Sequence, residues 1–297
     1  MRIGIFGGDD ANGPVDRLVD DARATADEGF AAYWLPQIFG FDALTALAVI
    51  GREVPGIELG TAVVPTYPRH PMMLAAQALT VQQASGGRFT LGIGLSHQIV
   101  IEGMLGIPFS KPVRHLREYL SILMPLVRGE ASAFEGETLT GKLALDIPEA
   151  DPVPVLVAAL GAQMLKVAGT RTEGTITWMT GPATIADHVG PAIRAAASDA
   201  GRPDPRIVAA LPVCVTDDPA AEREKAGKLF AIYGHLPSYR AMLDREGAAG
   251  PADVAIVGTE AEVRAGIEGV IEAGATDFVA VPFSNRDATL DVVASMQ

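Results

Sequence analysis

Short apolar segments alternate with segments of helical periodicity from one end of the 297-residue chain to the other. Each apolar segment is nearly continuous in hydrophobic residues, which is typical of a strand that is covered on both faces. In the segment that follows, apolar residues recur every three or four positions, as they do along one face of an amphipathic helix. The predicted strands are residues 3–6, 31–35, 57–64, 89–95, 153–159, 174–179, 207–215 and 276–282.

Proline and glycine mark the ends of the predicted helices. Pro14 and Pro71 open helical patterns, and Gly29 and Gly86 close them. Proline suits the first helical turn and glycine suits the position after the last one. The other helical patterns cover residues 44–50, 113–128, 161–169, 183–200, 260–273 and 288–296, with a long polar stretch around 222–233.

Eight strands, each with a helix behind it, predict an α/β protein with a (β/α)8 TIM barrel. A doubly wound open sheet would show the same alternation and is the alternative. Because no low-complexity linker divides the chain, we expect a single domain over residues 1–297. Turn-rich or polar segments predict insertions after strands 4 and 7, at about residues 98–112, 129–152 and 217–250.

The chain is acidic, with a formal net charge of −13. It lacks the basic character that binding to nucleic acids or membrane surfaces requires, so we expect a small-molecule partner and neither of these. Cys214 is the single cysteine, so no internal disulfide can form. The N-terminal apolar segment is too short for a signal peptide, and we therefore expect a cytoplasmic protein.

Stiff and polar residues follow the third predicted strand in the segment Pro65-Thr-Tyr-Pro-Arg-His-Pro71. In a TIM barrel, residues after the C-terminal ends of the strands carry the chemistry. Tyr67, Arg69 and His70 are therefore candidates for the functional rim. The alternative is structural, with Arg69 bound to backbone carbonyls and His70 capping the helix that begins at Pro71.

A second group of candidates follows the fourth predicted strand. Gly94 ends a Gly-x-Gly segment, which lets either a flat ligand or another backbone segment approach closely. Ser96 and His97 come directly after it, on the same predicted rim as Tyr67. The five histidines of the chain are scattered without metal-ligand spacing, so no metal site is predicted.

The loops after the fifth and sixth predicted strands offer further candidates. Leu160-Gly161-Ala162 leads into a helix whose N-terminal amides can bind an anion. Lys166 and Arg171 are nearby basic residues in a very acidic chain. Trp178 and Met179, at the end of the sixth strand, could wall an aromatic ligand or could belong to the core.

Several of these segments together resemble a known superfamily. The strand ending at Val64 precedes Tyr67-Pro-Arg-His-Pro71, and the next strand lies in Gly87-Arg-Phe-Thr-Leu-Gly-Ile-Gly94. Val153-Pro-Val-Leu-Val-Ala-Ala159 and the small residues before Gly174 follow. Over nearly the whole chain, these segments resemble the luciferase-like monooxygenase superfamily. Within it they resemble the branch that uses the deazaflavin coenzyme F420, such as methylenetetrahydromethanopterin reductases.

The resemblance implies a flat cofactor ring at the C-terminal rim of the barrel. Coenzyme F420 is the expected cofactor, and FMN is the alternative. A bulge with a non-prolyl cis peptide, within Ala62-Val63-Val64, would press on the ring from behind. The turn that carries Arg69 would hold the bulge and line the pocket. By analogy with the family, a homodimer is expected.

The resemblance also assigns the remaining cofactor contacts. Residues Gly94, Ser96 and His97 would lie along the ring and its polar side chain. Leu160-Gly161-Ala162 would meet the ribityl phosphate. Trp178-Met179 and Arg171 would lie near the tail. Since that tail is anionic, we also expect Lys166 to contact it.

At two places the chain departs from the F420 branch. Gln37-Ile38 stands where that branch usually has an Asp-His pair, and Leu95-Ser96 where an acidic residue is common. Gln37 can still form a hydrogen bond to a ring carbonyl or to the deazaflavin hydroxyl. His97 and Tyr67 become the candidate acids, and histidine is the better matched to neutral pH.

The function implied by the resemblance is that of an F420-dependent oxidoreductase. It would transfer a hydride between the deazaflavin cofactor and a small unsaturated, imine or carbonyl-type substrate. An FMN-dependent luciferase-like monooxygenase is the alternative among enzymes. A non-catalytic F420- or flavin-binding protein is a third hypothesis, motivated by the replaced Asp-His pair.

Overall fold

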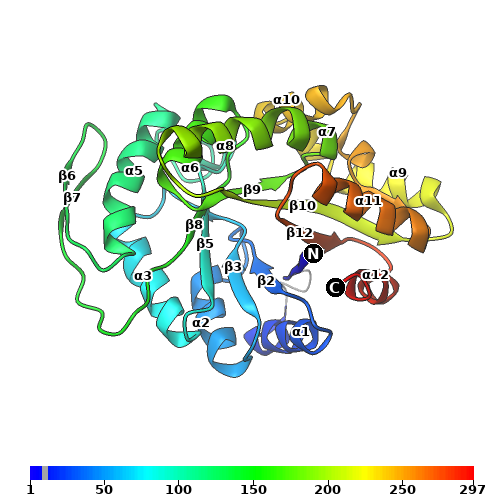
Figure 1. Cartoon of the computed structure of the whole chain (residues 1–297), viewed down its shortest axis with the longest axis horizontal. Coiled ribbons are helices and arrows are strands. Elements are labelled where there is room, and N and C mark those ends of the chain that lie inside the picture. The colour runs from blue at the N-terminus through cyan, green and yellow to red at the C-terminus, as the bar shows by residue number, and fades with distance from the viewer. Residues whose placement is uncertain (9–12) are drawn as a thin grey trace.

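A computed structural model of the protein, which describes residues 1–8 and 13–297, contains eight parallel strands that close into a barrel (Figure 1). The barrel closes because β10 pairs with both β9 and β12, and β12 pairs with β1. The predicted TIM barrel is therefore confirmed, and the open sheet is excluded. In ring order the strands are β1 (Arg2–Phe6), β2 (Ala32–Leu35), β3 (Glu58–Thr61) continued by β4 (Val64–Pro65), β5 (Phe89–Gly94), β8 (Val155–Val157), β9 (Gly174–Trp178), β10 (Arg206–Val215) and β12 (Asp277–Pro282).

Helices connect successive strands and surround the barrel. At the start of α2, Asp42 accepts a hydrogen bond from the Thr45 amide at 2.9 Å. His70 caps α3 in the same way, accepting from the Met72 amide at 3.2 Å, so the predicted cap is confirmed. None of the described helices is long and apolar enough to cross a bilayer. The helices are α1 (Val15–Asp27), α2 (Ala43–Glu53), α3 (Pro71–Ala84), α5 (Pro112–Leu126), α6 (Ala162–Arg171), α7 (Pro182–Thr184), η1 (Ile185–Val189), α8 (Gly190–Asp199), α11 (Glu260–Glu272) and α12 (Arg286–Ala294).

The three segments predicted as insertions have their own secondary structure. Residues 98–112 contain the short helix α4 (Gln98–Ile101). Residues 129–152 contain an antiparallel hairpin of β6 (Ser132–Glu135) and β7 (Thr140–Leu143), which packs outside the barrel against α5 (Figure 1). Its turn is fixed by Glu118, which accepts hydrogen bonds from the amides of residues 137–139.

The third of these segments, residues 217–250, is mostly helical. It contains α9 (Pro219–Leu229), η2 (Ala231–Gly234) and α10 (Pro237–Glu246). After it come η3 (Pro251–Asp253) and β11 (Ile256–Gly258), which the hydrophobic pattern did not predict. The pattern missed β11 because this short strand pairs only with the C-terminal end of β10, outside the closed ring.

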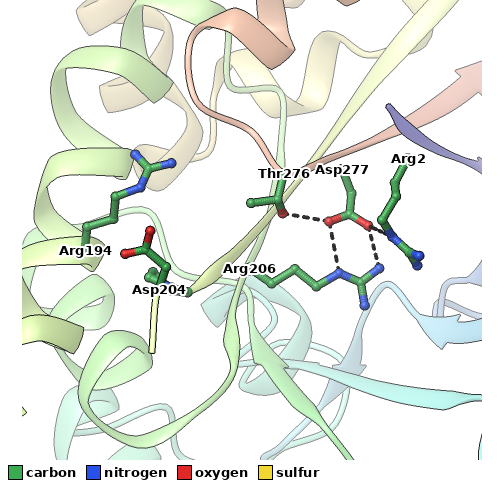
Figure 2. Close-up of a pocket in the computed structure, with 7 residues that line it drawn as sticks. Arg2, Arg194, Asp204, Arg206, Thr276 and Asp277 are labelled. Carbon is green, nitrogen blue, oxygen red and sulfur yellow. Dashed lines mark hydrogen bonds and ion pairs between the residues drawn. The ribbon is translucent and has the colours of Figure 1, made fainter. Parts of the chain in front are cut away.

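A cluster of charged residues closes the barrel at the N-terminal ends of its strands. Arg206 binds Asp277 through Nε at 3.0 Å and Nη2 at 2.6 Å, and it binds Glu58 through Nη1 at 2.6 Å. Figure 2 shows its guanidinium facing the Asp277 carboxylate, with Arg2 on the other side of that carboxylate. Burial opposes ionisation of Arg206, but hydrogen bonds to Asp277 and Glu58 raise its pKa overall. Since its charges are already paired, we interpret this cluster as structural.

One extra residue interrupts the third barrel strand between β3 and β4. Gly60 pairs with Thr90 and Val64 pairs with Ile93, so three residues face two on β5. The peptide bond between Ala62 and Val63 is cis, which confirms the prediction drawn from the resemblance. It also corrects the prediction of one continuous strand over residues 57–64.

Thr61 and Gly92 hold the two strands together at this interruption. The Thr61 Oγ1 accepts a hydrogen bond from the Gly92 amide and donates one to the Gly92 carbonyl, both at 2.8 Å. A Cβ on Gly92 would lie 2.0 Å from the Thr61 carbonyl oxygen, and one on Gly94 would lie 2.8 Å from Val63 Cγ2. The Gly-x-Gly segment therefore admits another backbone segment, which was one of its two predicted uses.

We predict that Gly92→Ala destabilises the protein strongly, by about 3 kcal/mol or more, because the new methyl group meets backbone atoms that cannot move aside. Gly269→Ala is the matched control, since a Cβ there meets nothing within 4 Å in helix α11. The control should gain about 0.5–1 kcal/mol from helix propensity. Thermal unfolding measures both, and equal midpoints for the two variants would contradict the prediction.

Candidate active site

The interior of the barrel ends at its C-terminal mouth in a layer of partly buried apolar residues. Below the mouth, Trp34 fills the centre and has 1% of its surface exposed. It fits there because Gly4 and Gly60 beside it have no side chains. The apolar layer at the mouth, called the floor here, consists of Phe6, Ala62, Val63 and Trp178.

The floor is formed by residues at the C-terminal ends of three strands that are spread around the barrel. Phe6 ends β1, Trp178 ends β9, and Ala62 and Val63 form the interruption after β3. The rings of Phe6 and Trp178 are stacked, with centroids 6.4 Å apart and planes at 17°. An apolar surface that remains partly open to solvent at the catalytic end of a TIM barrel suits the binding of a planar ring.

His97 lies beside the floor, in the loop after β5. Ser96 has a φ of 62°, so the chain turns sharply in the left-handed region before His97 precedes α4. Burial lowers the pKa of His97, so its imidazole is neutral at pH 7. Its side chain has no hydrogen-bond partner among the residues the structure describes, and its ring contacts Tyr239 at a centroid distance of 5.7 Å.

Aromatic residues of the segment 217–250 form a wall above β9 that the sequence analysis did not predict. Phe230 and Tyr233 both contact Trp178 edge-on, with centroids 5.7 Å away. Tyr239 contacts Tyr233 at 5.1 Å. The sequence does contain a sign of this wall, namely three aromatic residues in an otherwise polar helical stretch. The pattern could not show which way these three side chains point.

Three predicted residues on the loops after β2 and β4 have structural partners. The Gln37 Oε1 accepts a hydrogen bond from the Ala43 amide at 2.8 Å, at the start of α2. Arg69 forms an ion pair with Asp42, the cap of the same helix. The Tyr67 hydroxyl donates to the Ser110 carbonyl at 3.1 Å. These contacts support the structural alternative for Arg69, although its partner is a carboxylate and not a backbone carbonyl.

Three further candidates are buried behind the surface of the mouth. Met179 has no exposed surface and packs in the core cluster beneath α9 and α11. Val64 also has no exposed surface, and Gly94 is buried. In this conformation Met179 therefore belongs to the core, while Val64 and Gly94 act by positioning Val63.

The N-terminus of α6 opens at the mouth. Gly161 is its cap and has no side chain to satisfy the first amides, and Gly161 and Ala162 are both exposed. The Leu160 carbonyl accepts a hydrogen bond from His188 Nε2 at 2.8 Å, which fixes the loop before the helix. Lys166 is exposed and forms no ion pair within residues 1–8 and 13–297.

The structure separates Arg171 from this group. Arg171 ends α6, about 13 Å along the helix axis from its start. There it donates hydrogen bonds to the Ser121 hydroxyl at 2.8 Å and the Arg117 carbonyl at 3.1 Å, both on α5. Its expected position near a cofactor tail at the mouth therefore has no geometrical support.

The chain belongs to the luciferase-like monooxygenase family, whose sequence model matches residues 1–277. A Mycobacterium tuberculosis protein, whose name assigns it to the coenzyme F420-dependent oxidoreductases, is 28% identical over 250 residues. That match covers 78% of this chain and 72% of the relative. The 5,10-methylenetetrahydromethanopterin reductase of Methanolobus tindarius is 26% identical over 236 residues, covering 79% of this chain and 72% of the relative.

Solved structures share the fold over nearly the full chain. The coenzyme F420-dependent tetrahydromethanopterin reductase from Methanopyrus kandleri matches with a TM-score of 0.83 at 20% identity, covering 99% of this chain and 97% of its own. The oxygenating constituent of 3,6-diketocamphane monooxygenase from Pseudomonas putida, in complex with FMN, matches with a TM-score of 0.77 at 16% identity, covering 99% and 96%. The structural neighbours thus include both F420-dependent and FMN-containing proteins.

His115 on α5 supports the loop that carries Tyr67. Its ring stacks on Tyr67 at a centroid distance of 3.9 Å, and its Nε2 lies 3.1 Å from the Thr66 hydroxyl. His115 is 6% exposed, and burial lowers its pKa to about 4. The folded protein therefore keeps this imidazole neutral, whereas the unfolded chain protonates it below about pH 6.5.

We predict that the free energy of unfolding falls by about 2 kcal/mol between pH 7 and pH 4.5 on account of His115. The loss occurs on acidification because the unfolded chain binds the proton more readily than the folded protein in this range. Urea unfolding of wild type and His115→Gln at both pH values measures it. On acidification, the free energy of unfolding should fall by about 2 kcal/mol less in the variant than in the wild type. An identical pH dependence of the two proteins would contradict this role of His115.

Proposed function

We propose that the protein is an F420-dependent oxidoreductase that transfers a hydride between the deazaflavin cofactor and a small unsaturated, imine or carbonyl-type substrate. The floor of Phe6, Ala62, Val63 and Trp178 is the observation that carries the proposal. It supplies an apolar surface at the mouth of a barrel in a family where two of the sequence relatives are named for F420-dependent oxidation or methanopterin reduction.

The residues at the mouth fit such a cofactor. Neither conformation nor packing requires glycine at position 161, because its φ is −77° and a Cβ would meet nothing within 4 Å. The absence of a side chain leaves room for a phosphate at the uncapped amides of α6. Lys166 lies about one helical turn further on and would add a positive charge, since helical side chains lean towards the N-terminus.

The side chains of the site would support the cofactor ring and donate hydrogen bonds to the ring and the substrate. A bound deazaflavin supplies or accepts the hydride. Ala62 and Val63 would support the ring from behind and exclude water from that face. The Gln37 side-chain nitrogen has no hydrogen-bond partner in the described part of the chain, so it can donate to a ring oxygen. Neutral His97 would donate a hydrogen bond to the substrate atom that becomes negative, whereas the Tyr67 hydroxyl is already bonded to Ser110.

The test is to titrate the purified protein separately with F420 and with FMN and to follow quenching of cofactor fluorescence. We expect F420 to bind with a Kd at least about tenfold below that of FMN, a difference of ~1.4 kcal/mol. Tight binding of FMN without binding of F420 would replace this proposal with an FMN-dependent monooxygenase. Binding of F420 without oxidation of its reduced form by enones, imines or carbonyl compounds would leave a cofactor-binding protein.

We predict that Lys166→Ala weakens F420 binding about two- to fivefold at low salt, and that this difference disappears near 1 M salt because the contact is to an anionic group. Arg171→Ala is the matched control, since it removes a positive charge from the other end of the same helix. It should bind F420 like the wild type at every salt concentration. Equal effects of the two substitutions would contradict the placement of the anionic group at the start of α6.

A further inference from the structure

Two hydrogen-bond donors without partners lie next to each other above the floor. His97 comes from the loop after β5 and Tyr239 from α10, and their ring centroids are 5.7 Å apart. Both side chains are partly buried. Neither the imidazole nor the Tyr239 hydroxyl has a hydrogen-bond partner among residues 1–8 and 13–297. Partly buried polar groups are normally paired, so these two donors are available to a ligand.

Both side chains are uncharged hydrogen-bond donors at neutral pH. Burial raises the pKa of the Tyr239 phenol, and burial lowers that of His97, which leaves a neutral imidazole with one N–H. Neutral donors bind an uncharged acceptor such as a carbonyl oxygen without the need for a counter-ion. The same groups become more effective as negative charge develops on that oxygen.

The surroundings of the pair are apolar and aromatic. Tyr233 and Trp178 continue the aromatic wall from Tyr239 to the floor. The loops after β2 and β5 carry exposed apolar side chains, with Phe39 exposed to 73% and Ile99 to 61%. Such side chains favour an apolar ligand over a charged one.

Two charged side chains of α10, Arg240 and Glu246, are already engaged. Arg240 donates to Asp244 and to the carbonyls of residues 248 and 249. Glu246 accepts from the amides of residues 183 and 184 at the start of α7, which lies beside α10 (Figure 1). Both charges are therefore committed to the fold, and Arg240 is not free to neutralise a carboxylate or phosphate of a substrate.

We propose that His97 and Tyr239 together bind the carbonyl oxygen of a neutral substrate whose apolar ring packs on the aromatic wall. The substrate class is an α,β-unsaturated ketone conjugated to a ring. This inference rests on the proposed function and adds to it a substrate class and a catalytic residue, Tyr239. In the reaction, a hydride from the reduced deazaflavin adds to the β-carbon and the π electrons move to the oxygen. The two donors stabilise that oxygen, and a proton from water then adds to the α-carbon.

The test compares two ligands of similar size and shape. Benzylideneacetone is neutral, whereas cinnamate carries the same ring and double bond with a carboxylate in place of the ketone. Quenching of tryptophan fluorescence in the cofactor-free protein measures binding, because Trp178 lies in the floor against the aromatic wall and the other tryptophan, Trp34, is buried. We expect benzylideneacetone to bind at least about tenfold more tightly, since cinnamate would have to bury an unpaired charge. Equal or tighter binding of cinnamate would overturn the proposal.

The role of Tyr239 is tested with Tyr239→Phe, which removes only the hydroxyl. We expect kcat/KM for benzylideneacetone with reduced F420 to fall about tenfold or more, mainly through kcat, while the Kd for F420 is unchanged. Tyr119→Phe is the control, because the buried Tyr119 hydroxyl on α5 has no hydrogen-bond partner in the described part of the chain. Wild-type kinetics for Tyr239→Phe would overturn the inference. Loss of F420 binding by the wild-type protein would instead contradict the proposed function.

Discussion

The site depends on the pair of hydrogen bonds between Thr61 and Gly92. One hydroxyl satisfies both the amide and the carbonyl of Gly92 at 2.8 Å, at the place where an extra residue interrupts the third strand. Without this link, the polar backbone groups beside the interruption would be buried without partners, which is costly. The link holds Ala62 and Val63 at the centre of the mouth. The glycines of β5 matter for the same reason, because any side chain there would push the two strands apart.

The two ends of the barrel have opposite physical character. At the N-terminal end, the guanidinium of Arg206 is held by two carboxylates and lies 5.6 Å from the centre of the Trp34 ring. The charges of Arg206, Asp277 and Glu58 are thus paired with one another at that end. At the C-terminal end, the floor is apolar and partly open, and the His97 imidazole and the Tyr239 hydroxyl have no hydrogen-bond partner among the described residues. We therefore expect ligands to bind at the C-terminal end of the barrel, where a ligand can bury apolar surface and form hydrogen bonds to unpaired polar groups at the same time.

The loops at the mouth combine residues that hold the structure with residues that are free to bind. Tyr67, Arg69 and the side-chain oxygen of Gln37 are bonded to other loops and to the start of α2. Their contacts fix the positions of the loops after β2 and β4. His97 and Tyr239 have no such partners. This division explains how the chain can lack the Asp-His pair usual in the F420 branch and still present hydrogen-bond donors above the floor.

The sequence by itself determined the order of the eight barrel strands and of the helices behind them, because these follow from hydrophobic periodicity and from proline and glycine at the helix ends. The interruption and its cis peptide were implied by the family that the motifs around Val64 and Gly94 resemble. The tertiary structure alone placed Tyr239 beside His97, because the two residues are far apart in the chain and meet only when α10 folds over the mouth. It also separated Arg171 from Gly161, since a helix carries its last residue away from its first. Local patterns reveal which faces are buried, but the direction of a side chain on a partly exposed helix is decided by packing.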